Sequence, residues 1–256
     1  MKKLLILIIC LFAARDLFAW GQKGHDITTY IAECHLSPEA AAKIDKILNG
    51  HSPVYYANWM DIASHNTEYG YTRSWHYLNV DEGETIQTTE RNPKGDVLSA
   101  ITTLVETLKT GKLSAEEEAV SLKMLIHLVA DMHCPMHTGH RSDLGGNRLS
   151  VKMFNRPTSL HSVWDSSLPE AIHRWSYSEW QNQIDRLSDD DATLIQAGEP
   201  SDWVNETYEI CTQIYNETPA DTNISYQYVD KYAQIVEMQF LKGGYRLARL
   251  LNEIYQ

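Results

Sequence analysis

The sequence is poor in cysteine, in basic residues and in apolar runs long enough to cross a membrane. It has four cysteines among 256 residues, and Cys10 lies in an N-terminal segment that we expect to be removed. The remaining three, Cys34, Cys134 and Cys211, cannot form a disulfide framework, because an odd set allows at most one bridge. The chain is long enough to be stabilised by a sizeable hydrophobic core instead.

Basic residues are also few, since 22 lysines and arginines stand against 34 aspartates and glutamates, for a formal net charge of −12. Removal of residues 1–19, which carry three basic residues and one acidic residue, changes this charge to −14. A chain this acidic lacks the positive field with which proteins bind duplex nucleic acid. With 43% hydrophobic residues it is also too apolar to be disordered.

The one long apolar run, residues 4–14, follows two lysines and precedes Ala19. This order is typical of a secretory signal peptide, and the run is too short to span a bilayer. We predict a signal peptide over residues 1–19, cleaved between Ala19 and Trp20, and a mature chain of one domain over residues 20–256. The expected location is therefore secreted or periplasmic, and no membrane anchor is expected.

Helical signals recur along the mature chain. Ser37 and Pro38 favour a helix start and Gly50 a helix end, while Ser114 and Glu117 form a capping box before a long apolar-periodic run. Similar periodicity marks residues 96–110, 201–215 and 227–254, whereas NRLSVKMF (147–154) alternates and favours a short strand or hairpin arm. The sequence predicts one all-α domain with a short hairpin or loop insertion.

Histidine and aspartate recur at a spacing of four residues. In IHLVADMHCPMH (126–137), His127 and Asp131 share one face of the predicted helix, and His137 follows a proline. The stretch LHSVWD repeats the spacing with His161 and Asp165. A single pair of this kind is more often an ordinary contact between neighbouring turns of a helix, but the recurrence favours metal ligands.

Four further residues extend the pattern. Asp61 lies in the apolar stretch NWMDIAS, and His76 lies in SWHYLN. His25 follows Trp20 by five residues, and signal cleavage would free the α-amine of Trp20, which can lose its proton to a metal near neutrality. His133 is rotated away from the other candidates on its helix and is interpreted as a surface histidine.

In their order along the chain, these motifs resemble those of the S1/P1 nucleases, a family of trinuclear zinc enzymes. The matching elements are an N-terminal Trp with His five residues later, WMD, WHYLN, HLVADMHCPMH, GGN at 145–147, and LHSVWD. The resemblance runs from Trp20 to about Asp165 and implies the helical fold of the phospholipase C/P1 nuclease type. Zinc phospholipases C resemble the chain less, because they have a longer gap after Trp and a Glu in place of Asp165.

The resemblance implies three Zn²⁺ ions, for which nitrogen and carboxylate ligands are suitable. Nine residues would bind them in three sets: Asp61, His76, His127 and Asp131; Trp20 (amine and carbonyl oxygen), His25 and again Asp131; and His137, His161 and Asp165. Asp61 and Asp131 would be the catalytic carboxylates, because Asp131 bridges two zinc ions and Asp61 also orients the attacking water. Cys134 lies outside the matched ligand set and is interpreted as a packing residue or a disulfide partner.

The resemblance also implies a pocket for one nucleobase. Its residues would be Tyr77 and Leu144, which sandwich the base, and Asn79, Gly145 and Asn147, which contact its edge. Asn79 stands where members that bind a base often carry Asp. Ser64 stands where a basic residue usually assists the phosphate, which leaves more of that role to zinc.

The resemblance thus predicts a secreted zinc-dependent endonuclease that hydrolyses single-stranded DNA and RNA to 5′-mononucleotides and also cleaves 3′-nucleotides. A base inside a duplex cannot be sandwiched, which accounts for the expected single-strand preference. Two alternatives stay open, a zinc-dependent phospholipase C and a non-enzymatic zinc-binding or storage protein. No oligomeric state follows from the sequence.

Overall fold

The computed structural model describes residues 21–256, so the predicted signal peptide and Trp20 lie outside the described residues. Helices dominate, and the described part contains only three short strands. The helical elements are α1 (Gln22–Cys34), α2 (Pro38–Ile47), α3 (Pro53–Tyr56), α4 (Trp59–Ala63), η1 (Gly70–Ser74), α5 (Val97–Lys109), α6 (Ala115–Met132), η2 (Pro135–Thr138), η3 (Arg141–Asp143), α7 (Leu160–Ser162), η4 (Val163–Ser167), α8 (Leu168–Ile172), α9 (Tyr177–Ile184), α10 (Asp189–Gln196), α11 (Pro200–Glu217) and α12 (Tyr226–Ile254). The strands are β1 (Ser150–Met153), β2 (Arg156–Ser159) and β3 (Asn223–Ile224).

The helices begin where the sequence predicts their caps. The Ser37 hydroxyl accepts a hydrogen bond from the Ala40 N–H at the start of α2. At the start of α6, Ser114 and Glu117 form the reciprocal capping box, in which each side chain satisfies the other residue's free N–H. The prediction of an all-α fold is confirmed.

The predicted hairpin is also present. Strands β1 and β2 pair antiparallel with Ser150 opposite Ser159, and Phe154 and Asn155 between them both have positive φ, as a tight two-residue hairpin turn requires. Strand β3 lies parallel to β1 on its other edge, which the sequence did not indicate. This small sheet leads directly into the segment that carries His161.

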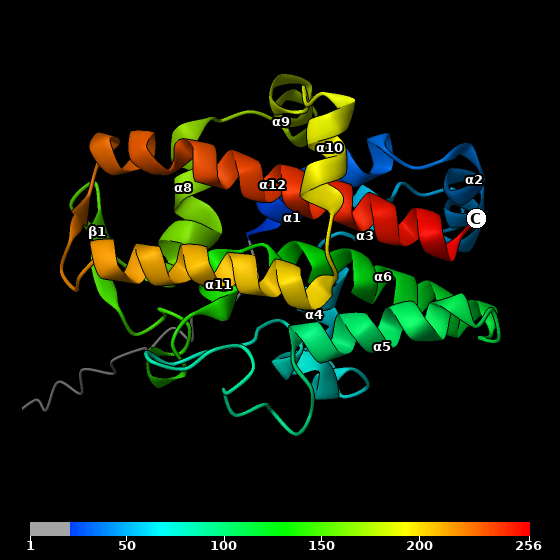
Figure 1. The fold of residues 1–256 in the computed structure, drawn as a ribbon, viewed down its shortest axis with the longest axis horizontal. Helices are drawn as coiled ribbons and strands as arrows, with labels where there is room; N and C mark the ends of the chain where they lie inside the picture. Colours follow the sequence, from blue (N-terminus) through cyan, green and yellow to red (C-terminus); the bar gives the residue numbers. More distant parts are fainter. Residues whose placement is uncertain (1–20) are drawn as a thin grey trace, which may run out of the picture.

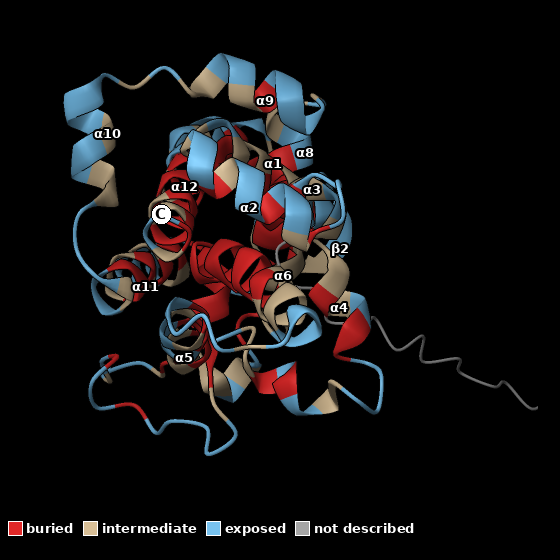
Figure 2. Cartoon of the chain, turned by 90° about the vertical axis from the view of Figure 1, so that its right-hand side faces the viewer, coloured by how far each residue is buried: buried red, intermediate tan, exposed pale blue. Residues whose placement is uncertain are grey.

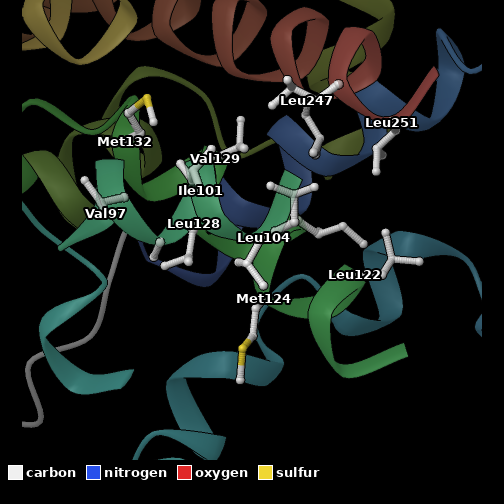
Figure 3. Packing of buried hydrophobic residues seen from close by; sticks show 14 of the residues in the cluster. Val97, Ile101, Leu104, Leu122, Met124, Leu128, Val129, Met132, Leu247 and Leu251 are labelled. Carbon is white, nitrogen blue, oxygen red and sulfur yellow. The ribbon is translucent and has the colours of Figure 1, made fainter. Parts of the chain in front are cut away.

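The core is built around α6, α11 and α12. Figure 1 shows α12 running across the molecule beside α11 and in the opposite direction, with α5 below them and α6 behind α11. In Figure 2 the buried residues gather where these helices face one another, while the outer faces of α9 and α10 are exposed. Figure 3 shows side chains of α5, α6 and α12 interlocking, and the labelled ones are Val97, Ile101, Leu104, Leu122, Met124, Leu128, Val129, Met132, Leu247 and Leu251.

Helices α1 and α12 approach each other closely at two adjacent glycines. A Cβ atom on Gly243 would come within 2.8 Å of the Thr28 methyl group, and one on Gly244 would overlap the Ile31 side chain. Only hydrogen fits at these positions, so α12 holds α1 at short range. Within residues 21–256, no helix is long and apolar enough to cross a membrane.

Candidate metal centre

Helix α6 brings the first two candidate ligands into the interior. Its second half is buried on all sides, because α1, α4, α5 and α12 pack around it. His127 and Asp131 are fully buried, and the His127 Nε2 atom lies 3.2 Å from Asp131 Oδ2. The spacing of four residues therefore places both side chains at one point, as the sequence predicts.

Asp131 lies at the centre of a group of histidines. Its Oδ2 atom is 2.9 Å from His76 Nδ1 and 3.2 Å from His127 Nε2. Its Oδ1 atom is 3.3 Å from His25 Nε2 and 3.5 Å from His137 Nδ1. Each carboxylate oxygen therefore faces a different pair of histidines, which is the arrangement of a carboxylate that can bridge two cations.

Two overlapping groups of ligand atoms result. The atoms of Asp61, His76 and His127 all lie within 4.8 Å of one another, and so do those of His25, His127 and Asp131. Asp61 Oδ1 is 3.4 Å from His127 Nε2. The structure thus brings together all the residues predicted for the first two zinc sites, except Trp20, which lies outside the described residues.

A third group lies beside the first two. His137 Nε2 is 3.7 Å from Asp165 Oδ1, and the sulfur of Cys134 lies within 4.8 Å of ligand atoms from both residues. The ring of His161 stacks on that of His137, with ring centroids 5.3 Å apart. Burial raises the pKa of the Cys134 thiol well above its usual value, which opposes formation of the thiolate that a metal requires. No disulfide joins the three cysteines of the described chain, all of which are free.

Backbone carbonyls orient three of the histidine rings. His127 Nδ1 lies 2.7 Å from the Ala57 oxygen, His137 Nδ1 lies 2.6 Å from the His76 oxygen, and His161 Nδ1 lies 2.7 Å from the Gly145 oxygen. A ring N–H directed at a carbonyl fixes the tautomer and leaves Nε2 as a lone-pair donor. This second contact is the usual support of histidines that ligate metals.

Several buried polar atoms of the cluster have no hydrogen-bond partner: His25 Nδ1 and Nε2, His76 Nε2, His137 Nε2 and Asp165 Oδ1. Each unsatisfied buried polar group destabilises a fold by about 1–3 kcal/mol. Their concentration at one place is explained if they face a cation. The donor set of imidazole nitrogen and carboxylate oxygen is one that zinc accepts, so the residues fit the metal that the sequence predicts.

The pKa shifts of His25 and Asp131 favour cation binding. At His127, by contrast, burial is outweighed by the carboxylates of Asp131 and Asp61, which raise the pKa well above its usual value, so a metal must displace that proton. Burial and the neighbouring His127 together lower the pKa of His25 to about 4, so His25 is neutral and can donate a lone pair. Burial opposes the charge of Asp131, but His127 and His137 outweigh it and hold its pKa well below the usual value. By contrast, burial raises the pKa of Asp165 well above the usual range, so a cation is needed to keep that carboxyl ionised.

The segment LHSVWD differs from the expected single helix. Ser159 caps its start by accepting the Ser162 N–H, but the short helix α7 passes into the π-helical turn η4 before Asp165. Such turns are frequent at functional sites. The Gly21 N–H donates to the Asp165 carbonyl over 2.7 Å, so the described chain begins directly beside this group.

A cavity of about 250 Å³ opens over the cluster. Its lining residues are Asp61, Ser64, His65, Arg73, His76, Tyr77, Asn79, Met136, His137, Leu144, Gly145, Asn147 and His161. All five residues predicted to contact a base are among them. Residues 144–146 have φ values of 59°, 65° and 80°, and a Cβ atom on Gly145 would lie 2.8 Å from the Met136 oxygen, so this turn depends on glycine.

The prediction that His133 lies on the surface is wrong. Its ring is fully buried, with Nδ1 2.7 Å from the Val129 oxygen and Nε2 3.1 Å from the Arg246 guanidinium of α12. The far side of α6 is covered by α11 and α12, so rotation away from His127 does not lead to solvent. Sequence reasoning also missed Arg73, although it lies only three residues before His76.

Comparison with known proteins agrees with this geometry. The S1/P1 Nuclease family matches residues 20–256, which extends the resemblance seen in the motifs to the C-terminal end. The chain is 28% identical to Nuclease P1 of Penicillium citrinum over 92% of its own length and 98% of that protein. It is 26% identical to Endonuclease 4 of Arabidopsis thaliana, covering 92% and 89% of the two chains. Nuclease S1 of Aspergillus oryzae is 25% identical, with coverage of 93% and 92%.

These matches favour the interpretation of the chain as a nuclease over the two alternatives, a zinc-dependent phospholipase C and a zinc-binding or storage protein. The prediction of the family from its motifs is confirmed. The chain belongs to the S1/P1 nuclease family and is a nuclease of the hydrolase class.

Proposed function

We propose that this nuclease uses three Zn²⁺ ions to hydrolyse single-stranded DNA and RNA to 5′-mononucleotides, and that it also cleaves 3′-nucleotides. The observation that carries the proposal is the buried histidine cluster around Asp131, which opens onto a cavity with an aromatic wall at Tyr77. A metal cluster without this wall would fit many hydrolases. The two together fit a phosphodiester attached to an unpaired base.

The metal assignment follows the three sets predicted from the sequence. Asp61, His76, His127 and Asp131 would hold the first ion, and His25 and Asp131 would hold the second with Trp20. Trp20 lies outside the described residues, and its assignment rests on the match to the family motif alone. His137, His161 and Asp165 would hold the third ion.

When bound, zinc supplies a Lewis acid that activates water and offsets charge on the phosphate. The chain positions the reactants. Asp61 is partly exposed to the cavity, so its carboxylate can accept a hydrogen bond from the attacking water and aim the oxygen at phosphorus. The carbonyl contacts of His127 and His137 keep those rings from rotating during the reaction.

The base would lie between Tyr77 and Leu144, whose side chains remain 38% and 44% exposed in the described chain. Stacking on an aromatic ring contributes about 1–3 kcal/mol and tolerates any base. Asn79 Oδ1 is buried without a hydrogen-bond partner and can accept an N–H from the base edge. A base must leave its duplex to enter this position, which gives the expected preference for single strands.

We also propose that the enzyme is exported, because the N-terminal lysines and the apolar run of residues 4–14 are typical of a signal peptide. Edman sequencing of the mature protein tests this directly. Export with cleavage would give Trp20 as the first residue, whereas a chain that retains residues 1–19 would contradict the assignment.

The function is tested by pairing metal analysis with substrate comparison. Purified mature protein should contain about three zinc ions per chain and should degrade single-stranded DNA and RNA faster than duplex DNA. Chelation should abolish this activity and lower the melting temperature, because zinc binds only the folded state. Rapid hydrolysis of phosphatidylcholine without nucleic acid cleavage, or one zinc or fewer in active protein, would refute the proposal.

A further inference from the structure

One basic side chain lines the cavity without forming an ion pair among the described residues. Among the described residues that line the cavity, Arg73 is the only arginine or lysine. Its Nε group donates to the Ser64 carbonyl oxygen over 3.0 Å, and within residues 21–256 no acidic group lies within ion-pair distance of the guanidinium. Arg91 and Arg246, by contrast, form ion pairs with Asp96 and Glu206.

The single hydrogen bond gives Arg73 a defined direction. Arg73 lies in the short 3-10 helix η1, three residues before His76, and its Nε contact joins it to the backbone of Ser64. Ser64 in turn donates its hydroxyl to the Asp61 carbonyl oxygen over 3.1 Å. Arg73 is therefore hydrogen-bonded to the segment that carries Asp61, and it lies three residues before His76; both residues are proposed zinc ligands. Its two Nη groups remain available to contact a bound molecule.

We propose that Arg73 binds a phosphate group of the nucleotide in this cavity, through its two Nη groups. This inference rests on the proposed nuclease function and adds a residue that the family motifs do not assign. A guanidinium presents parallel N–H groups that match two phosphate oxygens, and it stays charged at every relevant pH. The chain is acidic overall, so a lone cation at the cavity gives the phosphate a specific place to bind, beside whatever charge the metal ions supply.

The test compares a nucleotide with its nucleoside. Zinc-loaded Arg73→Ala should bind adenosine 5′-monophosphate at least about tenfold more weakly than the wild type, which is the effect of losing a hydrogen bond to a charged group. Its affinity for adenosine should change less than twofold, because the nucleoside lacks the phosphate. Arg73→Lys should restore part of the loss, since it keeps the charge but lacks the planar pair of parallel N–H groups.

The matched control is Arg156→Ala, which removes the same charge from an exposed hairpin residue that does not line the cavity. It should leave both affinities unchanged. Salt provides a second readout: the slope of log KM against log salt on single-stranded DNA should fall by about 0.7 in Arg73→Ala, the value for one phosphate contact. Zinc content should be the same in all variants.

The outcomes separate the two proposals. Equal affinities in Arg73→Ala and Arg156→Ala would overturn the inference while the wild type still cleaves single strands. If Arg73→Ala weakened the binding of adenosine as much as that of adenosine 5′-monophosphate, the inference would also be overturned. Arg73 would then act on the base pocket and not on the phosphate. If the wild type neither cleaves nucleic acid nor binds either compound, the proposed function itself fails.

Discussion

Replacement of Asp131 by asparagine tests the shared carboxylate at the centre of the cluster. The change keeps the shape of the side chain but removes its charge and converts one oxygen into an NH₂ group, which cannot ligate. In the structure, Oδ2 faces His76 and His127 while Oδ1 faces His25 and His137, at 2.9–3.5 Å. Of the two proposed zinc sites that share Asp131, one therefore loses a ligand oxygen, and the other loses the negative charge that offsets its cation.

The size of the effect follows from this geometry. Loss of a residue that only supports a metal ligand reduces metal affinity by about 10–100-fold. Loss of a ligand shared by two ions should reach at least the upper end, about 100-fold or about 2.7 kcal/mol. Asp165→Asn is the matched comparison, because it makes the same chemical change at a carboxylate that serves one proposed site.

The assay is zinc content after dialysis against limiting zinc, together with anomalous-scattering occupancies of each site. Asp131→Asn should lose zinc from both bridged sites, whereas Asp165→Asn should lose only the third ion. Far-UV circular dichroism would verify that both variants retain their helices. Full zinc content in Asp131→Asn, or an identical pattern of loss in the two variants, would show that Asp131 does not bridge.

Three further predictions address the base site, the N-terminus of the mature chain and the ion pairs of Glu206 between α11 and α12. Tyr77→Ala should raise KM for nucleotide substrates, because it removes a stacking free energy of about 1–3 kcal/mol. Unchanged kinetics would exclude Tyr77 from the base site. A cytosolic chain that begins Met-Trp20, verified by mass spectrometry, should fold but be at least about tenfold less active, because its Trp20 nitrogen is a planar amide that cannot ligate; equal activity would refute the terminal ligand. Burial opposes the charge of Glu206, yet Lys242 and Arg246 outweigh it and lower its pKa, so its charge stabilises the fold above the unfolded-state pKa. Glu206→Gln should therefore reduce the free energy of unfolding at pH 7 by about 1 kcal/mol, and in urea titrations the difference should shrink as pH falls below about 4; a difference independent of pH would contradict the ion pair.

Much of the site could be predicted from the sequence because its ligands follow local geometry. The spacing of four residues between His127 and Asp131 places both on one face of a helix, whatever surrounds that helix. Caps such as Ser114 are equally local, since the groups that they satisfy lie within one turn. These features required no knowledge of the tertiary fold.

The features that escaped prediction depend on tertiary packing. His133 points away from the cluster, but whether that direction meets solvent or α12 is decided by a helix more than a hundred residues later. Arg73 lies at the cavity with its Nε group bound to the carbonyl oxygen of Ser64, nine residues earlier, a contact that no local pattern predicts. The transition from α7 to the π-helical turn before Asp165 likewise has no signal in the residue pattern.

The close approach of α1 and α12 at Gly243 and Gly244 has a consequence for how the enzyme matures. Helix α1 carries His25, and the residues of α12 that it packs against are synthesised after every proposed ligand. Residues 20–165 contain every proposed ligand, yet the contacts that position α1 and its His25 form only when α12 docks. We therefore expect zinc to bind fully only after α12 has docked, and a fragment truncated before α12 should lose the metal centre without losing a single ligand residue.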